Sequence, residues 1–130
     1  MPLASMAQKN GTGERREDLA PLLKRFPLLG RPDGAQWMSG TMGDARVPGP
    51  STYWIDALVR LQPDHAAWLR RQYPVQPGSD SPDVVGGLRP LLPAGPWSRS
   101  AALDAALSQQ GFAAKAYLSG DQLVLVALGQ

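Results

Sequence analysis

The sequence predicts a single α+β domain with about four antiparallel strands in two hairpins and three to four short helices packed mainly on one face. Three observations support this. Apolar residues alternate in two pairs of segments, other segments have helical apolar spacing, and prolines stand at the ends of the helical segments. We expect residues 1–17 to be a flexible N-terminal tail and residues 18–130 to form the domain.

The first element is a short helix expected over residues 19–26. Its leucines and Phe26 recur at helical spacing, and Asp18 stands where an N-cap would lie. Pro27 ends the helix, because proline has no backbone N–H to donate and restricts the residue before it.

Two strands are expected next, over residues 35–42 and 53–61. In the second strand, every other residue from Tyr53 to Leu61 is apolar. The opposite face is mixed and suits a sheet whose second side is only partly covered or binds something. That face carries Trp54, Asp56, Leu58 and Arg60.

The middle of the chain predicts three more helices. Pro63 opens the first and Pro74 ends it. The second is expected over residues 82–88, although Gly86 and Gly87 either weaken it or allow another backbone to approach closely. The third follows Ser98 or Ser100 and ends near Gly111, a residue type common after helices.

The last segment predicts a hairpin of residues 112–118 and 122–128, joined by a turn at Ser119–Asp121. The second arm is apolar on both faces, so we expect it at the centre of the sheet. The first arm alternates alanines with Lys115 and Tyr117, so we expect it nearer an edge.

Composition excludes several classes of site. Without cysteine the chain cannot form a disulfide, an iron–sulfur cluster or a Cys-ligated zinc site. His65 is the single histidine, which excludes a His-rich metal site, and we expect no cofactor and no catalytic residue. Lacking a long apolar run and a secretory leader, the chain reads as a cytoplasmic protein without membrane contact. Abundant Ala, Gly, Pro and Arg suggest a bacterial source with a GC-rich genome.

The basic character of the chain is slight. Thirteen Lys and Arg oppose eleven Asp and Glu, although the isoelectric point is about 9.3. The densest basic points are Arg15–Arg16, Lys24–Arg25 and Arg70–Arg71, and none forms a run of five or more. We therefore interpret them as solvated helix surfaces and do not expect nucleic-acid binding; the oligomeric state stays open.

The segment from Trp37 to Trp54 is the strongest candidate for a binding site. It places tryptophans, small hydroxyl side chains and an Asp–Arg pair around a loop stiffened by Pro48 and Pro50, and such residues dominate interface energetics. The candidate binding residues are Trp37, Ser39, Thr41, Asp44, Arg46, Tyr53, Trp54, Asp56 and Arg60. The alternative is that both tryptophans belong to the core and the loop merely connects two strands.

Two functions remain open from the sequence. The first is a non-enzymatic accessory, inhibitor or immunity-like protein that binds another protein through the 37–54 loop and the mixed strand face. The second is a small-molecule-binding protein or small enzyme, in which Asp56, partly buried, would be a candidate general base. That site would also include Arg60, Ser39, Thr41 and His65.

Overall fold

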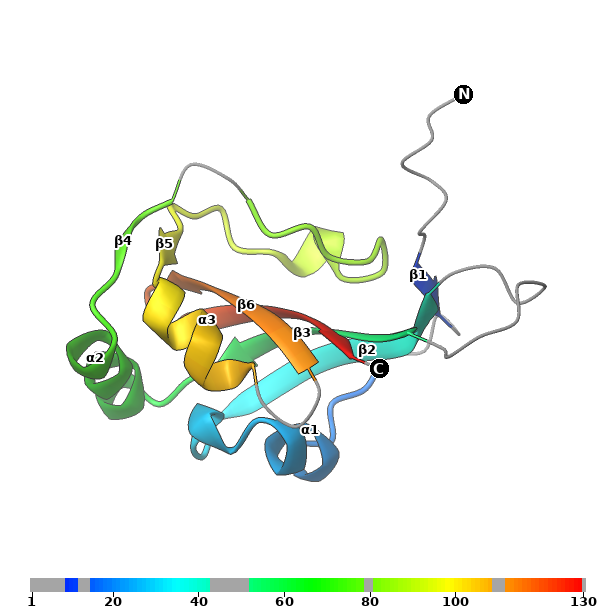
Figure 1. Ribbon diagram of the computed structural model, residues 1–130, viewed down its shortest axis with the longest axis horizontal. Helices are drawn as coiled ribbons and strands as arrows, with labels where there is room; N and C mark the ends of the chain where they lie inside the picture. Colours follow the sequence, from blue (N-terminus) through cyan, green and yellow to red (C-terminus); the bar gives the residue numbers. More distant parts are fainter. Residues whose placement is uncertain (1–8, 12–14, 43–51, 79–80, 109–111, 130) are drawn as a thin grey trace.

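The computed structural model describes residues 9–11, 15–42, 52–78, 81–108 and 112–129. These residues form an α+β fold around one antiparallel sheet of seven strands, in the order β1-β2-β3-β7-β6-β5-β4 (Figure 1). The strands are β1 (Lys9–Gly11), β2 (Gly34–Met42), β3 (Thr52–Arg60), β4 (Gln76–Pro77), β5 (Ser98–Arg99), β6 (Phe112–Ser119) and β7 (Gln122–Gly129). The helices are α1 (Ala20–Arg25), α2 (Pro63–Gln72) and α3 (Ala101–Leu107), with the 3-10 turns η2 (Pro27–Leu29) and η3 (Arg89–Leu91).

The prediction of four strands in two hairpins is wrong, because the described residues form one sheet of seven strands. The four expected strands are β2, β3, β6 and β7, and they pair in sequence order within each half of the sheet. Three further strands, each two or three residues long, extend the two edges. Strands this short contain no full period of alternation, so the sequence pattern could not identify them.

The position of the last strand agrees with its composition. β7 lies between β3 and β6, and Leu123, Val124 and Leu125 are completely buried. A strand buried on both faces needs apolar side chains in both directions, which explains the lack of alternation in this segment. The prediction of a central position for residues 122–128 is confirmed.

All three helices cover the same face of the sheet, as Figure 1 shows. Leu22 of α1, Leu69 of α2 and Leu103 of α3 belong to one apolar cluster, which also contains Ile55, Ala57 and Val59 of β3. The predicted caps hold in part. Pro63 stands at the start of α2, and the Ser100 Oγ accepts a hydrogen bond from the Leu103 N–H at 3.2 Å.

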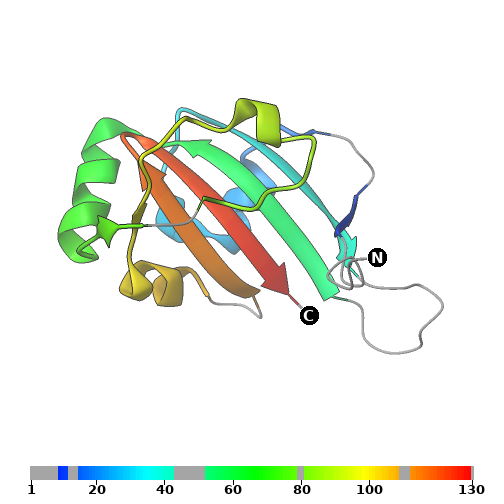
Figure 2. The same ribbon diagram turned by 90° about the horizontal axis from the view of Figure 1, so that it is seen from above.

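The opposite face is covered by residues 81–97, which we call the strap, and Figure 2 shows it crossing over the strands. The helix predicted over residues 82–88 is wrong, because this stretch has no α-helix and continues into η3. Its Val84 and Leu88 are buried with Trp54 in a second apolar cluster. A Cβ atom on Gly87 would lie 2.8 Å from the Met38 Sδ, so this glycine permits the close approach of a side chain and not of the backbone that the sequence analysis expected.

Part of the segment expected to be a tail pairs with the sheet. Lys9–Gly11 is β1, antiparallel to β2, and Arg16 exchanges two backbone hydrogen bonds with Trp37 of β2, at 2.8 and 2.9 Å. The described residues contain no helix with the length and apolar character needed to cross a membrane.

Candidate functional site

The two tryptophans of the predicted site are core residues. Trp37 is 4% exposed and belongs to the helix-side cluster, whereas Trp54 is 0% exposed and belongs to the cluster beneath the strap. They extend to opposite faces because they lie at alternating positions of paired strands. A role for either indole as an exposed contact is therefore contradicted by its burial.

The remaining residues of the predicted loop site fall into two groups. Asp44 and Arg46 lie outside the described residues, as does the side chain of Thr41. Tyr53 is 50% exposed, and Ser39 is half-buried. Of the predicted loop residues, these two are the ones that the structure places within reach of a partner.

Asp56 is buried beneath the strap. Its carboxylate Oδ2 accepts a hydrogen bond from the backbone N–H of Val85 at 2.7 Å. A buried carboxylate needs such donors, because an unsatisfied charge in the interior is costly. The hydrogen bond therefore fastens the strap to the centre of the sheet, which is a structural task.

The second expected site, around Asp56 and Arg60, is not assembled. Arg60 is exposed at the end of β3, on the same face as Asp56 but four residues along the strand. His65 lies on the helix side, where its Nε2 is 2.7 Å from the Leu28 carbonyl oxygen and its ring stacks on Trp68. Ser39 follows Trp37 on the helix side of β2, so these side chains do not surround one space.

A hollow of about 430 Å³ opens on the helix side of the sheet, at the end where β2 and β3 approach the loop. Ser39 and Gly40 are small residues in its wall, and Pro21 and Arg25 of α1 border it from the helix layer. The hollow is lined by Arg16, Pro21, Arg25, Trp37, Ser39, Gly40, Tyr53, Trp54, Ile55 and Phe112. Four of these, Trp37, Ser39, Tyr53 and Trp54, were predicted binding residues.

Gly129 explains how Phe112 reaches this hollow. Tyr53, Gly129 and Phe112 are neighbours in register across β3, β7 and β6. A Cβ atom on Gly129 would lie 2.6 Å from the Phe112 Cε1, so the missing side chain leaves room for the ring. The wall of the hollow at this point is therefore aromatic on both sides of a glycine.

Arg16 is held in one orientation by two neighbours. Its guanidinium lies 4.2 Å from the centre of the Trp37 ring and donates two hydrogen bonds to the Asp18 carboxylate. The hydrogen bond from Arg16 is the main cause that lowers the pKa of Asp18 below its ordinary value. Asp18 is thus an ion-pair partner and not the N-cap of α1, and Leu19 stands at the cap position without a side-chain hydrogen bond.

Arg25 provides the second positive charge. Its guanidinium lies 5.4 Å from the centre of the Phe112 ring. Among the described residues it has no carboxylate partner, so its charge is available to a ligand. Sequence reasoning noted Lys24–Arg25 and Arg15–Arg16 only as basic pairs on solvated surfaces. The approach of Phe112 to Arg25 could not be predicted from the sequence, because Phe112 is far along the chain from both basic pairs.

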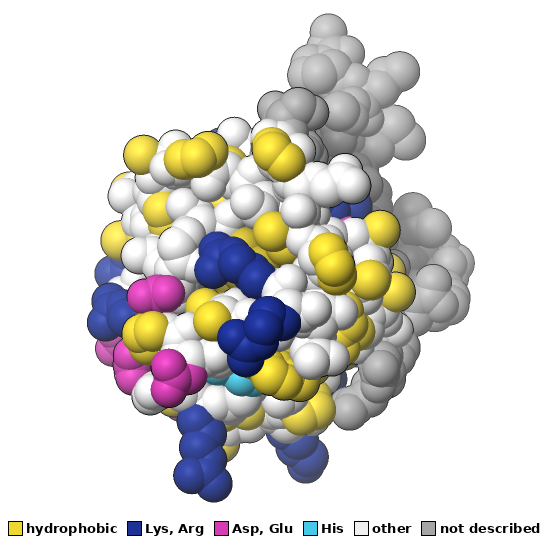
Figure 3. All heavy atoms as spheres, turned by 90° about the vertical axis from the view of Figure 1, so that its left-hand side faces the viewer, with side chains coloured by type: hydrophobic (Ala, Val, Ile, Leu, Met, Phe, Trp, Pro, Cys, Tyr) yellow, Lys and Arg dark blue, Asp and Glu magenta, His cyan; other side chains and the backbone are white. Residues whose placement is uncertain are grey.

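The described residues contain no group of three His, Cys, Asp or Glu side chains that could hold a metal ion. Seen from the side of α2, the histidine is largely covered, and the basic side chains are scattered among hydrophobic, polar and acidic ones (Figure 3). This face therefore presents no continuous basic patch of the kind that contacts nucleic-acid backbones.

Comparison of the chain with protein-family models, with curated proteins and with solved structures gives no match.

Proposed function

We propose that this protein is a non-enzymatic binding module, an accessory, inhibitor or immunity-like protein, that contacts another protein at the hollow on the helix side of the β2–β3 end. The observation that carries the proposal is the pairing of two guanidinium groups with aromatic rings around an open space bordered by exposed Tyr53. Tyrosine, tryptophan and arginine supply most of the energy at protein interfaces.

The arrangement is prepared for binding before the partner arrives. Arg16 is fixed by Asp18 and Trp37, so little side-chain freedom is lost when it meets a ligand. Trp37 itself is anchored by its Nε1–H, which donates to the Asp18 carbonyl oxygen at 2.8 Å. The core therefore holds the basic wall of the hollow in place.

The test places a photo-crosslinking amino acid at Tyr53 and, as a control, at Trp68, an exposed aromatic residue on α2. We expect one protein adduct that forms from position 53 and not from position 68 in cells of the source organism. With that protein purified, Tyr53→Ala should weaken binding by about tenfold or more, as expected for an aromatic anchor. Adducts that are the same from both positions, or an affinity unchanged by Tyr53→Ala, would contradict the proposal.

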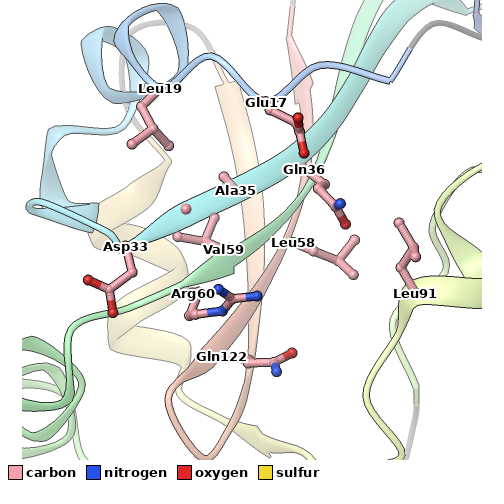
Figure 4. Close-up of a pocket in the computed structure, with 11 residues that line it drawn as sticks. Glu17, Leu19, Asp33, Ala35, Gln36, Leu58, Val59, Arg60, Leu91 and Gln122 are labelled. Atoms are coloured by element: carbon pink, nitrogen blue, oxygen red, sulfur yellow. The ribbon is translucent and has the colours of Figure 1, made fainter.

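A second candidate function, small-molecule binding, is favoured by another hollow of about 360 Å³ at Arg60. Figure 4 shows Arg60 and Gln122 on one side of it and Glu17 and Gln36 on the other. Side chains of both charges and two amides around one space suit a small zwitterion such as an amino acid. Stabilisation of the protein by a free amino acid in a thermal-shift screen, lost in Arg60→Gln, would support it; stabilisation that persists in the variant would exclude this hollow.

A further inference from the structure

Arg25 borders two hollows, not one. Besides the hollow at the β2–β3 end, it lines a second one of about 370 Å³ between the end of α1, η2, the end of α2 and α3. Apart from Arg25, the residues of this second hollow carry no charge, and Leu28, Tyr73 and Ala106 are half-buried in its wall. The second hollow is therefore suited to an uncharged, apolar side chain.

The boundary between the two hollows is an aromatic ridge. Phe26 lines the second hollow and Phe112 lines the first, and their rings pack edge to face with centres 5.7 Å apart. The Arg25 guanidinium lies 5.4 Å from the Phe112 ring centre. A positive charge at this ridge favours an anionic group at the middle of a ligand that occupies both hollows.

We infer that the two hollows form one bipartite site for an extended segment of the partner protein, with a carboxylate side chain at its centre and an apolar side chain on each side. The inference rests on the proposed function and specifies the partner's chemistry. A carboxylate can accept two parallel hydrogen bonds from a guanidinium, which fixes its position as well as its charge. Alternate side chains of an extended segment point the same way, so the three contacts fall at every second residue.

The neighbouring lysine provides a matched control. Lys24 is exposed on the same turn of α1 as Arg25, carries the same charge and borders neither hollow. If binding required only positive charge on this surface, it would depend equally on Lys24 and Arg25. An effect of the bipartite site would depend on Arg25 alone.

The experiment titrates the ¹⁵N-labelled full-length protein with the capped peptide acetyl-Leu-Ser-Glu-Ser-Phe-amide and follows the backbone amide signals. We expect signals near Leu28 and near Phe112 to shift together, with one dissociation constant. Arg25→Gln should weaken binding by about tenfold, the loss expected for one charge-assisted contact, and Lys24→Gln should leave it unchanged. Ala106→Leu, which fills the second hollow, should weaken the binding of the same peptide several-fold. The amide spectrum of this variant should remain that of a folded protein.

Two further peptides decide the chemistry. Replacing the glutamate with glutamine should weaken binding as much as Arg25→Gln does, and replacing Leu and Phe with alanine should abolish it. Equal binding of the glutamine peptide, shifts confined to one hollow, or no shift at millimolar peptide would overturn the inference. The proposed function would survive that failure if position 53 still crosslinked to one partner. Conversely, the peptide could bind as expected while no protein crosslinks specifically from position 53. That result would support the bipartite site and contradict the proposed function.

Discussion

At the residue scale, Gly30 adopts a backbone conformation that other residues strongly disfavour. Its φ is +73° and its ψ is −129°, at the end of η2. A Cβ atom there would also lie 2.9 Å from the His65 Cε1, and this ring is held by the Leu28 carbonyl. The glycine thus lets the chain turn from η2 towards β2 directly against the imidazole.

Gly30→Ala is expected to lower the free energy of unfolding by about 1–3 kcal/mol, because it adds backbone strain and displaces His65. Urea unfolding followed by circular dichroism measures the change. Gly34→Ala is the control, since a Cβ atom at Gly34 meets nothing within 4 Å. Equal stability of the two variants would show that the turn is not constrained as described.

Asp56 is the second residue whose role follows from its surroundings. Removing its carboxylate in Asp56→Ala leaves the Val85 N–H without this acceptor beneath the strap. We expect a loss of about 2 kcal/mol in the free energy of unfolding, together with faster hydrogen exchange at the Val85 amide. Asp121→Ala, at an exposed turn, is the control, and unchanged Val85 exchange in the Asp56 variant would refute the fastening role.

At the element scale, Asp104 of α3 and Ser108, which caps the end of α3, protect the edge of β6. β5 pairs with β6 at one position, Ser98 with Leu118, which leaves the rest of the β6 edge without a strand. The Ser108 Oγ accepts a hydrogen bond from the Ala114 N–H at 2.8 Å, and the Asp104 Oδ1 accepts one from the Ala116 N–H at 2.9 Å. Backbone donors that could pair with another chain are thereby occupied.

The double variant Asp104→Ala/Ser108→Ala should expose this edge. We expect faster hydrogen exchange at the amides of residues 114 and 116, and dimers or larger species in size-exclusion chromatography with light scattering. Lys115→Ala changes an exposed side chain of the same strand and is the control. It should keep the exchange rates and the oligomeric state of the native protein. A double variant with native exchange rates at both amides would show that α3 does not guard the edge.

At the scale of the whole molecule, the sheet separates two apolar layers. The helices form one layer, and the strap forms the other through Val84, Leu88 and Trp97 packed on Trp54. An irregular segment can serve as a layer when its apolar side chains are spaced to meet the sheet and its polar groups find partners.

Leu88→Ala should therefore behave as a core substitution although Leu88 lies outside any α-helix or strand. It is completely buried, and we expect its truncation to lower the free energy of unfolding by about 2–4 kcal/mol. Leu128→Ala is the matched control, because Leu128 is 39% exposed, and its truncation should cost well under half as much. Similar losses in the two variants would contradict the strap's role as a layer.

The main elements could be predicted because their signals are local. Pro27, Pro63 and Pro74 mark helix ends, and the alternation from Tyr53 to Leu61 places the two faces of β3 correctly. The strap was misassigned because Ser81–Pro82–Asp83 followed by helically spaced apolar residues satisfies the pattern of a helix start. A local pattern cannot show that Gly87 packs against Met38, because Met38 lies in another part of the chain.

The candidate site was predictable only where its residues neighbour the loop. Ser39 and Tyr53 were identified from the composition of the 37–54 segment, whereas Arg16, Arg25 and Phe112 were not. By itself the sequence determined which residues alternate, which are apolar and where helices end, since these depend on neighbours along the chain. The tertiary structure alone decided which tryptophans are buried, what covers the second face and which charges meet, because packing joins segments that no local period connects.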